Sequence, residues 1–204
     1  VKLNGSIARP SIHADLTASR FALQHMRLNQ ALIKGEINSA EQISGQLEVN
    51  LNGFNYDDIK VNQLKLTANG DEQKHSLQLQ SDGTPVATNL NFTGNFNRTL
   101  QQWKGTLSQI MIKSEFGNLQ TNKNVAVTYN NKTTEATISA HCWIHSHADL
   151  CFPQSFNVGA NGEVPFDIKR FNLAFINKLL EQELLSGQLN SQGKVAWFTD
   201  KPLQ

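Results

Sequence analysis

The densest group of side chains that could do chemistry lies around the two cysteines. Cys142 and Cys151 bound a short segment that also contains His145 and His147, and His141 directly precedes the first cysteine. Each cysteine stands in an apolar run with a polar turn between them, which favours a hairpin closed by a cross-strand disulfide and hence an oxidising compartment. Mixed Cys and His ligands also bind zinc, although their usual signature is a close Cys pair or a spaced His pair. Unpaired cysteines and a zinc site therefore remain alternatives.

The sequence contains no catalytic motif that we can identify. It lacks a Gly-x-Ser-x-Gly elbow, a phosphate-binding glycine loop and a His-Glu-x-x-His pair. His13, His25 and His75 are isolated, which is typical of solvated or sheet-face histidines. We therefore predict no enzymatic activity, no catalytic or metal site and no cofactor.

Composition restricts the partners of the chain. Its 204 residues are 39% hydrophobic and 17% charged, with a formal net charge of +1. Phosphate binding needs clustered Lys and Arg, so the absence of a basic cluster argues against a nucleic-acid partner. The longest apolar runs are far shorter than the roughly 20 residues of a transmembrane helix. Because the sequence opens on Val1 with no signal peptide, we expect residues 1–204 to be a single segment cut from a larger protein.

Most of the chain alternates between apolar and polar residues, which predicts β-strands with one apolar face. Leu107 has the opposite parity to Ile110, so a bulge near Ser108 and Gln109 is needed to keep both on one face. The residues that we predict to line the apolar face are Leu47, Val49, Leu51, Leu64, Leu66, Leu77, Leu79, Leu90, Phe92, Phe96, Ile110, Ile112, Val125, Val127 and Ile138.

Several local signals predict where these strands end. Pro10 predicts a break or bend in a strand that starts at Ser6, and residues 23–33 predict short strands. The sequences Asn69-Gly70-Asp71 and Ser81-Asp82-Gly83 predict turns between alternating residues, and hence a hairpin over residues 64–79. Helical spacing of leucines predicts a helix over residues 171–185.

One apolar face could pack against a second sheet, as in a sandwich. However, only one predicted helix is available to cover it, and apolar residues are too few for a second layer. We therefore predict an all-β fold, a curved and incompletely closed antiparallel sheet that forms a taco-like trough with an apolar interior.

The chain resembles the TamB-like proteins of the AsmA-like group. The resemblance covers most of the chain, and its most specific parts are the cysteine hairpin and a Trp-Lys-Gly-Thr-Leu segment. The residues that carry it are 5–10 (GSIARP), 64–70 (LKLTANG), 75–79 (HSLQL), 85, 90–94, 103–107 (WKGTL), 141–143 (HCW), 150–152 (LCF) and 187–197. The match suggests an internal piece in or next to the conserved C-terminal region.

The resemblance implies a function in the envelope of Gram-negative bacteria. TamB-like proteins are anchored in the inner membrane and extend across the periplasm to TamA, an outer-membrane barrel of the Omp85 type. They are linked to outer-membrane protein assembly and to phospholipid transport between membranes. For this chain, the resemblance implies that the apolar trough shields phospholipid acyl chains or nascent outer-membrane protein strands, with a purely structural spacer as the alternative.

Overall fold

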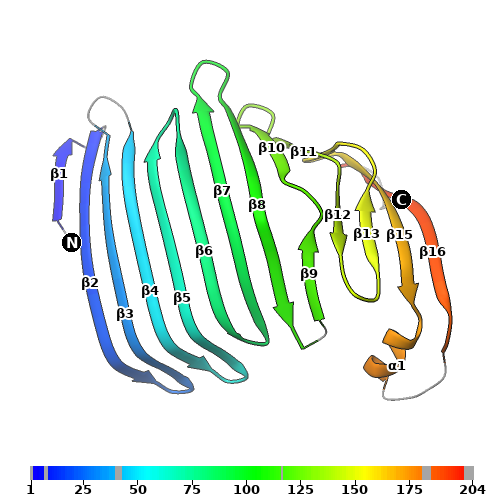
Figure 1. Cartoon of the computed structure of the whole chain (residues 1–204). Helices are drawn as coiled ribbons and strands as arrows, with labels where there is room; N and C mark the ends of the chain where they lie inside the picture. The colour runs from blue at the N-terminus through cyan, green and yellow to red at the C-terminus, as the bar shows by residue number, and fades with distance from the viewer. Residues whose placement is uncertain (1, 7–8, 40–42, 116, 181–184, 200–204) are drawn as a thin grey trace.

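The computed structural model describes residues 2–6, 9–39, 43–115, 117–180 and 185–199. In these residues, one sheet of sixteen strands accounts for most of the chain, and the sheet is antiparallel throughout (Figure 1). One helix, α1 (Ala174–Leu180), is described. The predicted all-β fold is therefore confirmed.

The first eight strands form a regular succession of hairpins, in which each strand pairs with the next. Their bounds are β1 (Lys2–Ser6), β2 (Arg9–Leu23), β3 (Met26–Asn38), β4 (Ser44–Tyr56), β5 (Ile59–Asp71), β6 (His75–Thr84), β7 (Val86–Asn97) and β8 (Gln102–Ser114). The remaining strands are β9 (Gly117–Thr121), β10 (Val125–Asn130), β11 (Glu135–Ile138), β12 (His141–Ile144), β13 (Asp149–Phe152), β14 (Phe156–Val158), β15 (Gly162–Asn172) and β16 (Gln188–Trp197).

The early strands are longer than predicted. The structure differs from the sequence prediction at Pro10 and at residues 23–33. Pro10 itself lies in β2 and pairs with Gly5 of β1, and the residues between the two strands, 7 and 8, are outside the described ranges. The short strands predicted for residues 23–33 are instead the adjoining ends of β2 and β3, because the two strands pair as far as Leu23 and Met26.

The predicted hairpin over residues 64–79 is confirmed, because Leu66 pairs with Leu79, but the two glycines lie in strands and not in the turns. Asn69 and Gly70 lie in β5, and the reversal follows Asp71, whose carboxylate accepts hydrogen bonds from the amides of Gln73 and Lys74, both at 2.8 Å. Gly83 lies in β6, beside a register shift in β5, where an added Cβ would come within 2.1 Å of the Lys60 carbonyl oxygen. That glycine permits a close approach of two strands and does not mark a turn.

The predicted bulge in β8 is confirmed. The register with β7 shifts between Asn89 and Asn91, and Gln109 has a φ of 53°. The Gln109 side chain accepts a hydrogen bond from Asn91 at 2.6 Å. The extra residue restores the alternation, so Leu107 and Ile112 face the same side of the sheet.

Beyond β8 the sheet divides into two arms. The first part of β8 pairs with β10, which leads through β11 and β14 to β15. The last part of β8 pairs with β9, which leads through β12 and β13 to the same β15. The arms are halves of long strands interrupted at residues 122–124, 139–140 and 153–155. The sheet is therefore split between β8 and β15 (Figure 1).

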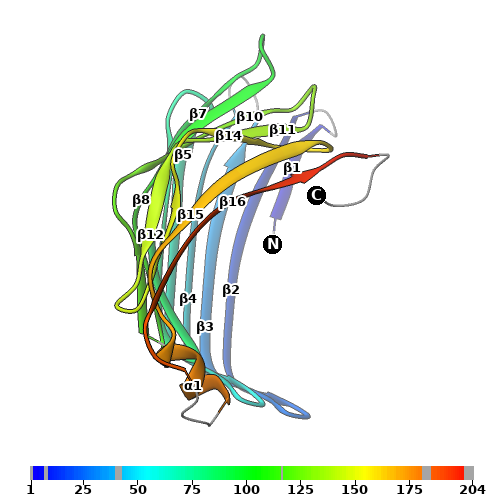
Figure 2. The same cartoon turned by 90° about the vertical axis from the view of Figure 1, so that its right-hand side faces the viewer.

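Figure 2 shows the sheet edge-on as a strongly curved, open ring, with β15 and β16 turning back toward the first strands. In the strands that precede β15, the rings of His141, Phe152 and Phe156 converge, with His141 and Phe156 each 5.0 Å from Phe152 between ring centroids. Phe156 pairs with Ile138, which lies on the apolar face. Side chains converge on the inside of a bend, so the apolar face is the concave one.

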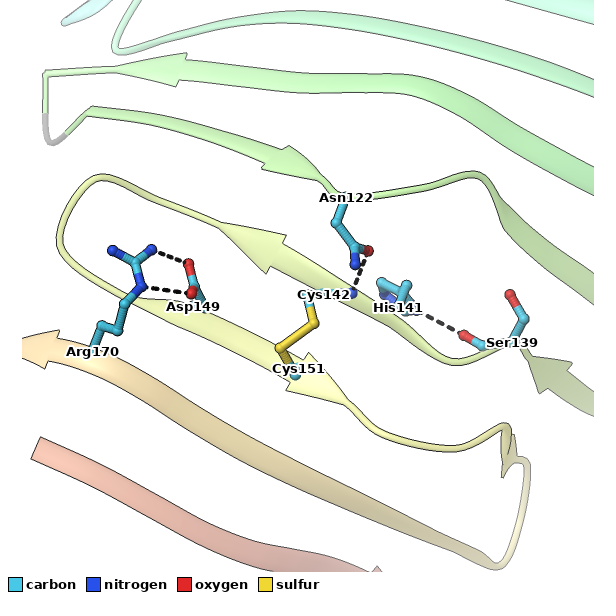
Figure 3. Close-up of a disulfide and its surroundings, with 7 residues drawn as sticks. All are labelled: Asn122, Ser139, His141, Cys142, Asp149, Cys151 and Arg170. Atoms are coloured by element: carbon cyan, nitrogen blue, oxygen red, sulfur yellow. Dashed lines mark hydrogen bonds and ion pairs between the residues drawn. A yellow bond between two sulfur atoms is a disulfide. The ribbon is translucent and has the colours of Figure 1, made fainter.

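The disulfide of the β12–β13 hairpin lies on the face of the sheet opposite to the apolar one, and polar contacts also hold this hairpin (Figure 3). Cys142 and Cys151 are directly paired, and their sulfur atoms form a disulfide. The Cys142 amide donates to the Asn122 side chain at 2.8 Å, which ties the hairpin to the end of β9. Arg170 forms two hydrogen bonds with Asp149, at 2.9 and 2.6 Å, and these bonds together with the negative charge raise the pKa of Arg170.

The helix begins three residues later than predicted, at Ala174 instead of residue 171. Phe171 and Asn172 still belong to β15, and the Asn172 side chain accepts a hydrogen bond from the Ala174 amide at 3.0 Å, as an N-cap does. Residues 181–184 of the predicted helix lie outside the described residues. Phe175 of α1 packs against His145 and His147 at the tip of the β12–β13 hairpin, with ring centroids 5.6 and 5.4 Å apart.

Candidate functional site

The register of the sheet brings all the predicted apolar residues to its concave face. Directly paired residues of antiparallel strands have their side chains on the same face, so the pairing defines rows across the sheet. The first row consists of Leu16, Ile33, Val49, Leu66, Leu79 and Leu90. The second consists of Ala14, Gly35, Leu47, Ala68, Leu77, Phe92, Leu107 and Val125.

The remaining predicted residues extend these rows. Leu51 and Leu64 continue from Ala18 and Ala31, and the same row reaches Ile112 through Ser81 and Thr88. Val127 and Ile138 pair with each other, Phe96 pairs with Trp103, and Ile110 follows the bulge opposite Leu90. Whether this face binds a ligand stays a prediction.

The concave face also includes residues that sequence reasoning did not place. In β3 these are Ala31, Ile33 and Ile37, whose alternation was hidden by polar-face Leu32. Near the C-terminus the face continues through the pairs Trp143–Leu150, Leu150–Ile168 and Val164–Val195. In β12 and β15, aromatic and aliphatic residues recur at every second position, and this alternation could have predicted that they lie on the apolar face.

No second layer covers this face in the described part of the chain. The buried hydrophobic residues there are few: Ala31, Val125, Cys151, Phe156 and Ala196. No large side chain among the described residues is fully buried. Leu16 and Ile37 keep 48% and 46% of their surface exposed, and Leu47 keeps 38%. The apolar rows are therefore open to a ligand or to solvent.

The concave face contains a hollow of about 510 Å³ over β4 to β7. Leu47, Leu77, Phe92 and Phe96 form its apolar wall. Asp71, Glu72 and His75 lie at its edge, where Glu72 forms an ion pair with Arg98, which raises the pKa of Arg98. A cavity of this size and lining can accept part of an acyl chain, with apolar contact as the main interaction.

The described residues do not gather into a site for metal chemistry. No three His, Cys, Asp or Glu side chains in the described ranges lie close enough together to hold a metal ion. His141 is buried, and its Nδ1 lies 2.8 Å from the Ser139 carbonyl oxygen. The two cysteines of the alternative zinc set are joined to each other.

Comparison with known proteins defines the family. Residues 1–204 match the family described as "TamB, N-terminal domain". The chain is 48% identical over 205 residues to the translocation and assembly module subunit TamB of Haemophilus influenzae, and the alignment covers 100% of this chain. It spans only 16% of that relative's length. No solved structure is significantly similar to the chain.

The expected position within the family is therefore wrong, because the match is to the N-terminal domain and not to the C-terminal region. One length of a sheet built from repeated hairpins has the same alternation as another, so pattern alone does not locate a segment along it. Within the described residues, α1 is too short to span a membrane, and no other helix is described. The chain belongs to the TamB family, and it corresponds to the N-terminal domain of that family.

Proposed function

We propose that this chain is a single periplasmic length of a trough that shields phospholipid acyl chains on their way between the inner and outer membranes. The observation that carries the proposal is the concave apolar face, whose rows cross β2 to β8 without a covering layer in the described residues. The protein of which it is a part would be anchored in the inner membrane of a Gram-negative bacterium and meet a TamA-like Omp85 barrel at the outer membrane.

The energy of transfer suits this function. Burying a methylene group is worth about 0.8 kcal/mol, so about ten carbons laid along the rows would gain several kcal/mol after the cost of ordering the chain. Apolar contact is non-directional, and neighbouring rows offer similar surfaces. A bound chain can therefore move along the trough without crossing a large barrier.

Photo-crosslinking in cells tests the proposal. We would place a photoreactive amino acid at Leu90 or Phe92 in the full-length protein, and at Asn91 between them as the control, because Asn91 faces the other side of the sheet. Phospholipid captured at Leu90 and Phe92 but not at Asn91 supports transport of lipid.

The same experiment separates the alternatives. Capture of unfolded outer-membrane protein instead of lipid would mean that the trough shields client strands. Absence of any capture at all three positions would mean that the domain is a structural spacer, and the proposed function would be rejected.

A further inference from the structure

The six-membered ring of Trp103 occupies the space beside two glycines of adjacent strands, through its Cζ2 and Cη2 atoms. An added Cβ on Gly94 would come within 2.6 Å of the indole, and one on Gly105 within 2.3 Å. Gly94 and Gly105 are directly paired in β7 and β8. Phe92 stacks on the indole, with ring centroids 4.6 Å apart and an interplanar angle of 19°. The two glycines therefore make a seat for the indole, which a side chain at either position would displace.

His75 holds the indole in that seat. The Trp103 Nε1–H donates a hydrogen bond to His75 Nε2 at 2.7 Å, and His75 Nδ1 lies 2.9 Å from the Asp71 carbonyl oxygen. Since Nε2 accepts, the proton must be on Nδ1, which then donates to Asp71. Both nitrogens of the neutral imidazole are satisfied.

This arrangement adjoins the hollow described above. His75 and Phe92 both line it, and Trp103 is in ring contact with both. An indole that left its glycine seat would have to move toward the concave side, because the backbone of the sheet closes the other side. The depth of the trough at this point thus depends on Trp103 staying in the space beside Gly94 and Gly105.

We propose that His75 is a positioning residue that sets the depth of the trough by holding Trp103 against Gly94 and Gly105, and that protonation of His75 releases the indole and weakens acyl-chain binding. The inference rests on the proposed function. A protonated imidazole has two donors and no acceptor, so it cannot receive the Trp103 N–H.

The charged groups around His75 are accounted for in the structure. On β5 and the following turn, the Asp71 carboxylate caps the turn and Glu72 is paired with Arg98, which comes from the β7–β8 turn. Lys74 lies on the same turn and is exposed, and Lys104 of β8 lies on the opposite face from Trp103. The hydrogen bonds of the His75 ring described above go to the Trp103 indole and to the Asp71 carbonyl group, and not to these charged side chains.

The test follows the indole N–H signals of the 204-residue chain by NMR from about pH 8 to about pH 5, the range in which histidines change charge. The Trp103 signal should shift on acidification. The Trp197 signal should not, because its Nε1–H donates to the Gly159 carbonyl at 2.9 Å. In parallel, we would measure uptake of an acyl-labelled NBD-phosphatidylcholine from phosphatidylcholine vesicles, since this headgroup keeps its charge in that range.

Two variants separate positioning from general structure. His75→Phe keeps the ring contact but provides no acceptor, so it should bind the lipid about fivefold more weakly at every pH, a factor equivalent to one net hydrogen bond. His75→Gln retains an acceptor that does not titrate, so it should bind like wild type at high pH and stay unchanged on acidification.

Glycine substitutions provide a matched pair. Gly94→Ala should displace Trp103 and reproduce the weak binding of His75→Phe. Gly162→Ala is the control, since it meets Trp197 at 2.2 Å in the same way but far along the sheet.

The inference would be overturned if the Trp103 indole N–H signal does not shift on acidification. It would also be overturned if the His75→Phe variant binds lipid like wild type. If wild type takes up no lipid at any pH, the proposed function fails, and the inference that rests on it fails as well. The indole titration then shows separately whether His75 holds Trp103.

Discussion

Leu79 and Leu90 stand directly opposite each other on β6 and β7, in the row that crosses the middle of the trough. Leu66 of β5 pairs with Leu79 from the other side. All three are half-buried. A charge at this position would lie inside the trough and not in a sealed core.

Leu90→Asp should block capture of lipid while the sheet remains folded. Leu90 is half-buried on an open face, so the carboxylate keeps contact with water and its cost stays below a typical domain stability of about 5–15 kcal/mol. The measurement is crosslinking at Phe92 in the variant, together with circular dichroism. Gln80→Asp, on the exposed face of β6, is the control and should leave capture unchanged. Normal capture in Leu90→Asp would contradict the proposed path.

The bulge at Gln109 predicts different stabilities for two substitutions. Its φ of 53° suits glycine and disfavours a β-branched residue. Gln109→Val should be less stable than Gln109→Gly by about 1–2 kcal/mol, as measured by urea unfolding. Both variants lose the hydrogen bond from Asn91, so the comparison isolates the backbone. Equal stabilities would mean that the bulge is not fixed at Gln109.

Loss of the disulfide should loosen one hairpin. Cys142 and Cys151 are separated by 9 residues, and closing so short a loop is worth about 2–3 kcal/mol. The double variant Cys142→Ser with Cys151→Ser should match reduced wild type in urea unfolding. Hydrogen exchange should rise in β12 and β13 while β3 to β7 keep their protection. A uniform rise across the sheet would show that the disulfide supports the whole fold.

The helix should depend on the aromatic side chain of Phe175. A helix as short as α1 is marginal alone, so outside contacts must support it, and its aromatic contact is the packing of Phe175 on His145 and His147. The Asn177 side chain also forms two hydrogen bonds with the Leu185 backbone. Phe175→Ala should abolish hydrogen-exchange protection of residues 174–180 and leave the strands protected. Leu180→Ala is the control, because Leu180 is 54% exposed. Retained protection in Phe175→Ala would point to other contacts.

Sequence reasoning worked where one physical rule dominated. Alternation placed Leu64, Leu66, Leu77 and Leu79 on one face because a strand has no other way to arrange them. The parity change after Leu107 required an extra residue, and the structure has it at Gln109.

Glycine was misleading because it serves two purposes. Gly83 allows a close strand approach and Gly94 lies under an aromatic ring, whereas the sequence indicates only flexibility. The seat of Trp103 depends on the register of three strands, so His75, Gly94 and Trp103 could not be connected by local spacing. The start of α1 was missed because the Phe171–Asn172 pairing with β16 outweighs helical spacing.

The division of the sheet between β8 and β15 also has a mechanical consequence. A pull across the undivided strands is shared by long ladders of backbone hydrogen bonds, but at β8 the load splits into two parallel paths. One path passes from β9 to β12 through Trp143 and Ile144, and the other from β14 to β15 beside Asn157 and Glu163. Under lateral tension these two short ladders would yield first, which makes this part of the wall its most compliant section.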